Sequence, residues 1–266
     1  MKMTKRILAI VSILVMLLCM AACGAKKESV VVGYTIYEPM NYENEAGELV
    51  GFDTDLAKAV FEKLGYEVVF KLIDWDQKYT ELNSGAIQCI WNGFTANTAD
   101  DDGVARADKV DFSYNYMGNK QVIVAKADLN AAIADAKSLS GKVGAVENSS
   151  AGDTYLTENL EGAIKKGVAS QLDAMKELSL GAVDFVVVDE QLAKAYVGKG
   201  DYAGFEISDK IYSDAEYYAI GFKKGSELTA NVNAVLEELA ADGTIAELAE
   251  TYDVSNTAIT DFSDQK

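Results

Sequence analysis

The amino-acid sequence predicts an α/β protein built from two similar lobes, each a mixed sheet flanked by helices, joined by two crossing strands. The first observation is an internal repeat, in which residues 81–90 (ELNSGAIQCI) recur as residues 177–186 (ELSLGAVDFV). In each copy a helical pattern ends at a glycine, and an apolar run of strand length follows. The second observation is the alternation of strand and helix patterns along the chain, which is typical of parallel sheets. Similarity over so short a stretch also arises by chance, and that alternative stays open.

The first lobe is predicted as a strand–helix–strand–helix–strand unit. Its strands are expected at residues 30–33, 68–73 and 87–91, and its helices at residues 55–64 and 80–84. The longer helix carries Leu56, Ala59 and Val60 on one face and ends at Gly65, as expected for an amphipathic helix packed on a sheet. Strands that alternate with helices in this way pair in parallel.

The second lobe repeats this pattern. Its strands are expected at residues 142–146 and 183–188, and its helices near residues 151–160 and 171–180. Two further helices, at residues 228–239 and 244–251, have no lobe of their own and are expected to pack back on the first. The predicted division is therefore residues 30–120 with 220–266 for the first lobe, and residues 121–219 for the second. The candidate crossing strands lie near residues 119–126 and 216–224, and two crossings make a hinge.

The N-terminus has the layout of an export signal. Lys2, Lys5 and Arg6 precede an uncharged apolar stretch from Ile7 to Leu18, and small residues follow it. This stretch is shorter than the roughly 20 residues that a membrane-spanning helix needs. Residues 1–22 are therefore expected to be removed as a signal peptide, and residues 23–29 to form a short tether.

Residues 20–24, Met-Ala-Ala-Cys-Gly, resemble the lipobox of bacterial lipoproteins, in which the cysteine becomes the lipidated first residue of the mature chain. The match departs from the family at Met20, where leucine is usual. Cys19 fits less well because a bulky residue precedes it, whereas Cys23 follows the small residue Ala22. The resemblance implies that Cys23 anchors the protein to the outer face of the cell membrane. The open alternative is a secreted protein cleaved nearby.

The composition excludes several classes of function. The formal net charge of −18 disfavours nucleic acid and gives no reason to expect attraction to anionic lipid. The chain has no histidine, so Ser-His-Asp and Cys-His catalysis are excluded, and no metal or cofactor is expected. If Cys23 is acylated and Cys19 is removed, only Cys89 remains and no intrachain disulfide forms. These features fit an extracytoplasmic globular protein and exclude most hydrolases.

Several motifs in a fixed order carry a family resemblance. They are Gly51–Ala59 (GFDTDLAKA), Gly93-Phe94-Thr95, Arg106–Ser113 (RADKVDFS), Gly141–Gly144 and Val186–Asp189. With these motifs the chain resembles the polar amino acid-binding proteins of ABC importers, the family 3 extracellular solute-binding proteins, over nearly all of the mature chain. It departs from the family pattern through a short insertion around Asp100–Val104, through Gln88 in place of an aspartate, and through Asn148 in place of a glycine.

The resemblance implies the type II periplasmic-binding-protein fold and a receptor that captures a free, polar L-amino acid between two closing lobes. Such a receptor passes its ligand to the membrane permease of an ABC importer and acts as a monomer outside the cytoplasm. The same fold also hosts periplasmic dehydratases of the cyclohexadienyl and arogenate type, which need an acidic side chain. Glu38, Glu43 or Glu147 could supply that acid, but their spacing singles out none of them. The binding protein is the favoured interpretation and the dehydratase is the alternative.

A zwitterionic amino acid needs hydrogen-bond donors for its carboxylate and an acceptor for its ammonium. Arg106 is the only arginine outside the signal segment, and its planar guanidinium matches a carboxylate. By the resemblance, Asp189 accepts from the ammonium at the end of an apolar run, where an unpaired carboxylate would be costly. Two alternatives stay open. Arg106 could lie on the surface and pair with the acidic run Asp100–Asp102, and Asp189 could cap the helix that begins at Glu190.

Further contacts follow from the resemblance alone. Those expected around the ligand's charged ends are Gly93, Thr95, Ser149 and Ser150, and those expected along its side chain are Tyr34, Tyr37 and Trp75. The serines would donate to the carboxylate from the lobe opposite Arg106. Each aromatic residue could equally be an ordinary packing residue of its lobe.

Two further pairs of acidic residues, Asp53 with Asp55 and Glu38 with Glu147, are expected to have different roles. Asp53 and Asp55 are expected to act as the cap and the first-turn acid of the helix that follows, and not to bind the ligand. Glu38 and Glu147 lie near the expected pocket, and they favour a ligand with a polar or cationic side chain. The sequence does not identify that side chain.

Overall fold

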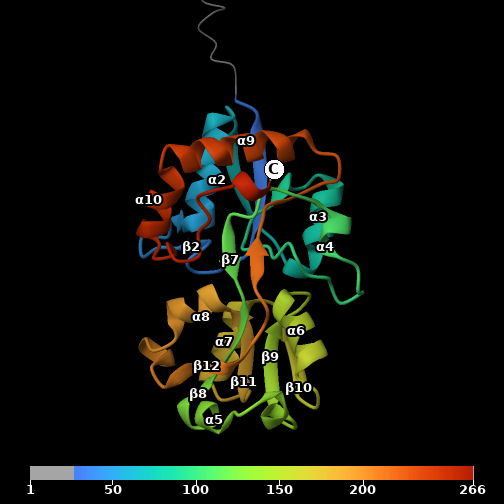
Figure 1. Ribbon diagram of the computed structural model, residues 1–266, viewed down its shortest axis with the longest axis vertical. Coiled ribbons are helices and arrows are strands. Elements are labelled where there is room, and N and C mark those ends of the chain that lie inside the picture. The colour runs from blue at the N-terminus through green and yellow to red at the C-terminus, as the bar shows by residue number, and fades with distance from the viewer. Residues whose placement is uncertain (1–26, 266) are drawn as a thin grey trace, which may run out of the picture.

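The computed structural model describes residues 27–265, which form two five-stranded sheets flanked by helices and joined by a two-stranded antiparallel ladder (Figure 1). The predicted signal peptide, residues 1–22, and the predicted anchor Cys23 lie outside the described residues. No helix within residues 27–265 combines the length and apolar composition that would let it cross a bilayer. The prediction of an α/β chain with two similar lobes and two connecting strands is confirmed.

The first sheet contains the three strands that the sequence predicts for the first lobe. In order across the sheet, its members are β4 (Glu67–Leu72), β1 (Ser29–Tyr34), β5 (Cys89–Ile90), β14 (Gly221–Phe222) and β6 (Asp111–Phe112). β1 pairs in parallel with β4 and β5, as predicted, whereas β14 pairs antiparallel with β5 and β6. A small hairpin of β2 (Tyr42–Glu43) and β3 (Leu49–Val50) lies beside this sheet.

The helices of the first lobe come from both ends of the chain. They are α2 (Phe52–Lys63), α3 (Lys78–Ser84), α4 (Arg106–Lys109), α9 (Glu227–Ala241) and α10 (Thr244–Thr251), with the 3₁₀ turns η1 (Trp75–Gln77) and η4 (Ser263–Gln265). Figure 1 shows α9 and α10, in red and orange, against α2 in the upper lobe. The C-terminal helices therefore pack back on the first lobe, because their apolar faces complete its core.

The second sheet combines predicted and unpredicted strands. In order, its members are β10 (Ile164–Val168), β9 (Val143–Glu147), β11 (Phe185–Asp189), β8 (Gln121–Lys126) and β12 (Phe205–Tyr212). Its helices are α5 (Ala127–Ala132), α6 (Ala151–Asn159), α7 (Gln171–Ser179) and α8 (Glu190–Tyr196), with 3₁₀ turns η2 (Ala136–Leu139) and η3 (Gly200–Tyr202). The sequence analysis did not predict β10 and β12, which lie at the sheet edges and carry many exposed polar side chains that blur the strand pattern.

The internal repeat corresponds to the same local structure in both lobes. α3 ends at Gly85 with φ of 80°, and α7 is followed by Gly181 with φ of 72°. These left-handed conformations suit glycine and reverse the chain into the strands β5 and β11. β5 lies next to the parallel strand β1, and β11 lies next to the parallel strand β9.

The connection between the lobes is shorter than the sequence analysis predicts. β7 (Met117–Asn119) pairs antiparallel with β13 (Glu216–Tyr218), and these two strands link the sheets. Residues 121–126, which were expected to cross, instead form β8 inside the second sheet. The apolar run of β8 is buried, which favours a sheet interior over an exposed crossing. The division into two lobes that move about this connection stays a prediction.

We expect Gly144→Ala to destabilise the protein, because β9 is packed closely against the core at this position. A Cβ atom on Gly144 would lie 2.4 Å from Cζ of Phe185 and 3.0 Å from Cδ1 of Leu156. Overpacking of this kind costs about 1–3 kcal/mol in the free energy of unfolding. Denaturant unfolding would measure the loss, with Gly204→Ala as the control, where a Cβ meets no atom within 4 Å. Equal stability of the two variants would contradict this account of the packing.

Candidate ligand-binding site

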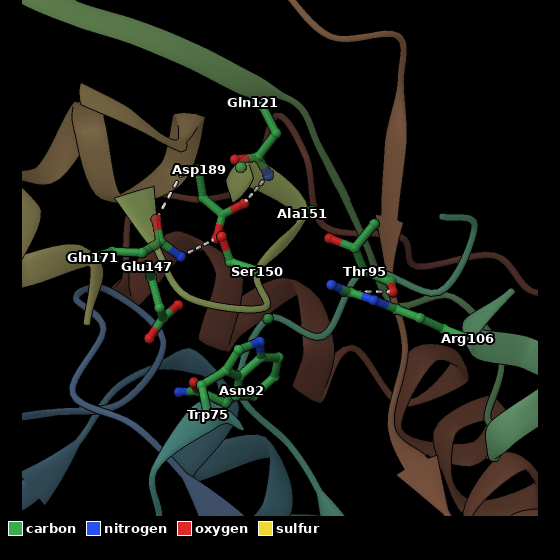
Figure 2. A pocket seen from close by; sticks show the side chains of 12 residues that line it. Trp75, Asn92, Thr95, Arg106, Gln121, Glu147, Ser150, Ala151, Gln171 and Asp189 are labelled. Atoms are coloured by element: carbon green, nitrogen blue, oxygen red, sulfur yellow. Dashed lines mark hydrogen bonds between the residues drawn. The ribbon is translucent and has the colours of Figure 1, made fainter. Parts of the chain in front are cut away.

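A small buried pocket lies between the two lobes, where the carboxyl ends of strands from both sheets approach each other (Figure 2). The free volume inside it is about 10 Å³, roughly what one water molecule needs. The first lobe contributes Trp75, Asn92, Gly93, Thr95 and Arg106, and the second contributes Gln121, Glu147, Ser150, Ala151, Gly152, Gln171 and Asp189. Open α/β sheets bind ligands at this end of their strands, so the pocket is the candidate functional site.

Most of the predicted contact residues line this pocket. Arg106, Asp189, Thr95, Gly93, Ser150 and Trp75 are all among the lining residues. Tyr34, Tyr37 and Ser149 are not. Tyr37 is buried and its hydroxyl shares a 2.6 Å hydrogen bond with that of Tyr218, whereas Tyr34 packs edge-on against Phe70. Both tyrosines therefore pack within the first lobe.

Arg106 is buried at the start of α4, with 1% of its surface exposed. Its Nε donates to Asp100 at 2.8 Å, and its Nη1 donates to the carbonyl of Thr95 at 3.2 Å. The proposed pairing with the acidic run is thus present, but in the interior and not on the surface. Asp100 belongs to the inserted segment, so the insertion holds the guanidinium in place and does not displace it from the pocket.

The charges around Asp100 explain its ionisation. Lys109 donates to Asp100 at 2.8 Å, and the hydroxyl of Tyr79 donates to it at 2.6 Å. Burial alone would raise the pKa of Asp100, but Arg106, Lys109 and Tyr79 together hold it below its usual value. Asp100 therefore stays ionised as the counter-charge of Arg106.

Asp189 ends β11 and is 5% exposed. Its Oδ1 accepts hydrogen bonds from Nδ2 of Asn119 at 2.6 Å and Nε2 of Gln121 at 2.5 Å, and its Oδ2 accepts from Nε2 of Gln171 at 2.5 Å. Burial raises the pKa of Asp189, while these amides act to lower it. Asp189 occupies the N-cap position of α8, but its side chain makes no capping hydrogen bond. The carboxylate is directed at the pocket amides, as Figure 2 shows.

The N-terminus of α6 forms another wall of the pocket. Ser150 caps this helix, because its Oγ accepts from the backbone N–H of Asp153 at 3.1 Å. The next two residues, Ala151 and Gly152, line the pocket at the first turn. First-turn N–H groups and the helix dipole favour an anion, so this wall can bind a carboxylate. Ser149 has a left-handed backbone, and its carbonyl accepts from Nζ of Lys78 at 3.1 Å across the lobes.

The sequence analysis missed several lining residues as ligand contacts. They are Asn92, Gln121, Gln171, Ala151 and Gly152, and Glu147 was nominated only as an acid or a charge near the pocket. Asn92 lies two residues after the end of β5, among the polar residues at that strand end, but it is not one of the contacts that the resemblance gives. Gln121 begins a strand and Gln171 begins a helix, so neither has a local signal that points to a pocket.

The expectation that Asp53 caps a helix is wrong. The N-cap of α2 is Gly51, and Asp53 lies inside the first turn with no exposed surface. Its Oδ2 accepts from the backbone N–H of Gly93 at 2.7 Å and from the hydroxyl of Tyr116 at 2.9 Å. Asp53 therefore holds the Gly93 segment of the pocket wall from behind. Asp55, in contrast, is a first-turn acid, as expected, and it pairs with Lys58 at 2.8 Å.

Besides Asp189, three carboxyl groups at or beside the pocket have raised pKa values. Burial raises the pKa of Asp53 to about 7, and burial with the nearby charge of Asp189 raises that of Glu216 to about 7 and that of Glu147 to about 8. Glu216 lies on the crossing strand β13 and accepts from Gln121 at 2.9 Å. Because burial is the main cause, these groups keep a large share of their protons near neutral pH, and a positively charged neighbour would favour their ionised forms.

We expect the ligand-free protein to become less stable as the pH rises from about 5.5 to 7.5. The folded state holds protons on Asp53, Glu147 and Glu216 in this range, whereas the unfolded chain, with carboxyl pKa values near 4, does not. Stability from these groups is fully present below the unfolded pKa and is lost as the pH rises through the folded pKa. Denaturant unfolding at several pH values tests this, and Asp53→Asn should flatten the dependence. A free energy of unfolding that rises over this range would contradict it.

Comparison with known proteins agrees with this geometry. The model of the bacterial extracellular solute-binding proteins, family 3, matches residues 30–255. The arginine-binding extracellular protein ArtP of Bacillus subtilis is 29% identical, with 88% of this chain and 92% of ArtP covered. The L-cystine-binding protein TcyA of the same organism is 28% identical, over 94% of this chain and 97% of TcyA.

A solved structure supports the same relationship. An ancestral arginine-binding protein bound to arginine is 35% identical and superimposes with a TM-score of 0.76, covering 85% of this chain and 98% of its own. The fold is the type II periplasmic-binding-protein fold that the sequence predicts. Since the family model spans most of the sequence, the chain belongs to the bacterial extracellular solute-binding proteins, family 3.

Proposed function

We propose that this protein is the substrate-binding component of an amino acid ABC importer and binds a free L-amino acid between its lobes. The observation that carries the proposal is a buried pocket with Arg106 on the wall from the first lobe and Asp189 on the wall from the second. A zwitterionic amino acid has a carboxylate that Arg106 can bind and an ammonium that Asp189 can bind. The relatives that bind arginine or cystine support an amino acid over other solutes.

The ligand carboxylate would lie between the guanidinium of Arg106 and the N-terminus of α6. Arg106 uses its Nε for Asp100, and its Nη1 and Nη2 each donate one N–H to the carbonyls of Thr95 and Ser149. The second N–H of each terminal nitrogen is available to a ligand. The backbone N–H groups of Ala151 and Gly152 would add donors from the second lobe. The ligand carboxylate would then accept hydrogen bonds from both lobes, so ligand binding would favour contact between the lobes.

The ligand ammonium would bind to Asp189. The three amides that donate to Asp189 are neutral, and a carboxylate can accept about four hydrogen bonds. A positive partner would therefore find an acceptor site and compensate the buried charge. The lobes would close about β7 and β13, and the hydrogen bond from Oγ1 of Thr154 to Asp101 at 3.3 Å is one of the contacts that would hold them together.

We propose binding without chemical conversion, in preference to the dehydratase alternative. A dehydratase needs a positioned acid, and Glu147 is the nominated acid that lines the pocket. The relatives described above are binding proteins. Recovery of a bound amino acid unchanged after long incubation would agree with this, and any dehydrated or decarboxylated product would overturn it.

The cellular setting belongs to the same proposal. We propose that the protein is a monomer outside the cytoplasm, held at the outer face of the cell membrane by lipid on Cys23, and that it delivers its ligand to a membrane permease. The net charge of −18 disfavours nucleic acid as a partner and gives no reason to expect direct attraction to anionic lipid.

A thermal-shift screen of refolded, ligand-free protein against the twenty amino acids, cystine and ornithine tests the function. A ligand at 100 times its Kd should stabilise the protein by about 2.7 kcal/mol. Arg106→Ala and Asp189→Ala should each weaken binding by roughly 30- to several-thousand-fold, because each leaves one buried charge unpaired at a cost of about 2–5 kcal/mol. Arg106→Lys should recover little, since one ammonium cannot reproduce the guanidinium fork.

The matched control for these variants is Asp209→Ala, an exposed acid on β12 that pairs with Lys210 and does not line the pocket. Its affinity should equal that of the unchanged protein. Calorimetry compares all four variants directly. Near-normal affinity in Arg106→Ala would exclude the proposed carboxylate site, and the absence of any stabilising amino acid would exclude the function.

The anchor is tested separately. We expect Cys23→Ser to release the protein from the membrane fraction without changing ligand affinity, because the site lies wholly within residues 75–189. Mass spectrometry of membrane-extracted protein should find a lipid-modified Cys23 at the mature N-terminus. An unmodified N-terminus on the protein from cells would rule out the lipid anchor.

A further inference from the structure

Glu147 is a buried carboxyl group in the pocket without a complete set of partners. It ends β9, is 4% exposed, and its Oε1 has no hydrogen-bond partner. Figure 2 shows its carboxyl group beyond Gln171, on the side of the pocket that faces Trp75 and Asn92. An unsatisfied buried carboxyl oxygen is costly, so this atom marks a place where a donor belongs.

Two other acids near the ligand, Asp189 and Glu216, already have several donors, and the unpartnered Oδ1 of Asp53 lies behind the pocket wall. Asp189 accepts from three amides, and Glu216 accepts from Thr95 at 3.2 Å, Asn119 at 3.1 Å and Gln121 at 2.9 Å. The two buried cations are also engaged elsewhere. Arg106 pairs with Asp100, and Nζ of Lys78 donates to the carbonyls of Trp75 and Ser149. Neither cation forms an ion pair with Glu147.

The charge balance indicates what kind of donor is missing. The buried acids at or beside the pocket are Asp53, Asp100, Asp153, Asp189, Glu147 and Glu216, and the buried bases are Arg106 and Lys78. Asp100 pairs with Arg106, and Asp153 pairs with Lys165. What remains is an excess of carboxyl groups over the single ammonium of Lys78. A zwitterion with a neutral side chain adds no net charge, whereas a cationic side chain adds the positive charge that would let Glu147 release its proton and ionise.

We infer that Glu147 binds the positively charged end of the ligand's side chain, so that the ligand is an amino acid with a guanidinium or ammonium group. The inference rests on the proposed amino acid site and adds its specificity. Asp189 and Glu147 would then divide the two positive groups of the ligand between them, and Trp75 would contact its methylene stem.

The groups that act on Glu147 come from several elements. They are Asp189 at the end of β11, Lys78 on α3, Asp76 on η1 and Arg106 on α4. Burial and Asp189 raise the pKa of Glu147 to about 8, so the empty site holds a proton there near neutral pH. A cationic ligand favours the ionised form and expels that proton. Proton release on binding is therefore a second readout that a purely structural role for Glu147 would not produce.

The test compares L-arginine with L-citrulline, which has the same shape and no side-chain charge. Isothermal titration calorimetry at pH 7.5 would be run on the unchanged protein, on Glu147→Gln, and on Glu161→Gln as the matched control at an exposed site of the same lobe. The unchanged protein and the control should bind arginine at least about 30-fold more tightly than citrulline, equivalent to about 2 kcal/mol. In Glu147→Gln this ratio should fall to a few-fold through weaker arginine binding, while citrulline affinity is kept.

The same titrations in buffers of different ionisation enthalpy measure the protons released. Arginine should release protons from the unchanged protein and from the control, and fewer from Glu147→Gln. An arginine-to-citrulline ratio that survives in Glu147→Gln, or neutral and cationic ligands bound equally by the unchanged protein, would overturn the assignment. If a neutral amino acid binds tightly and Arg106→Ala abolishes its binding, only the inference about Glu147 fails. If no amino acid binds, the proposed function fails with it.

Discussion

The burial of charge between the lobes is the constraint on which this structure depends. A carboxylate taken out of water must gain hydrogen bonds or a counter-ion, and Asp189 gains three amide donors. These amides come from Asn119 on β7, Gln121 on β8 and Gln171 on α7, so one carboxyl group ties together a crossing strand, a sheet and a helix. The same logic places Arg106 against Asp100. The polar groups of the pocket are therefore held in ion pairs and hydrogen-bond networks. Removing one member would leave its partner buried and unsatisfied.

The connection between the lobes and the pocket share hydrogen bonds. Glu216 of the crossing strand β13 accepts from Gln121 and Asn119, which also donate to Asp189, and from Thr95 of the first lobe. A change in the angle between the sheets would alter these distances, and the pocket and the crossing strands would then respond to each other. Asp53 plays a similar part within the first lobe, where it holds Gly93 through its backbone N–H. The site is therefore positioned by residues that do not line it.

The chain combines a widely used fold with features of its own. The insertion around Asp100–Val104 supplies both the counter-ion of Arg106 and the acceptor for Thr154 across the lobes. Glu147 adds a second carboxyl group, besides Asp189, to the lining of a pocket in which a zwitterion needs only one. Relatives of similar identity are an arginine-binding protein and a cystine-binding protein, so overall similarity leaves the ligand open. All amino acids share the α-carboxylate and the α-ammonium, so the residues that bind these two groups cannot discriminate between ligands. Specificity must instead come from residues that face the ligand's side chain, such as Glu147.

The sequence by itself determined the features that depend on local pattern. Helix periodicity, the glycines after α3 and α7, and the apolar runs of β1, β4, β9 and β11 are properties of short segments, and they predicted both lobes. Arg106 and Asp189 were also recognisable, the first as the only arginine in the sequence outside the predicted signal peptide and the second as an acid at a strand end. Tertiary structure decided the rest. Gln121, Gln171 and Glu216 reach the pocket only because distant segments pack together, and Asp53 faces the interior because its helix docks with that side inward. Burial and pairing belong to the packed chain, and no local pattern encodes them.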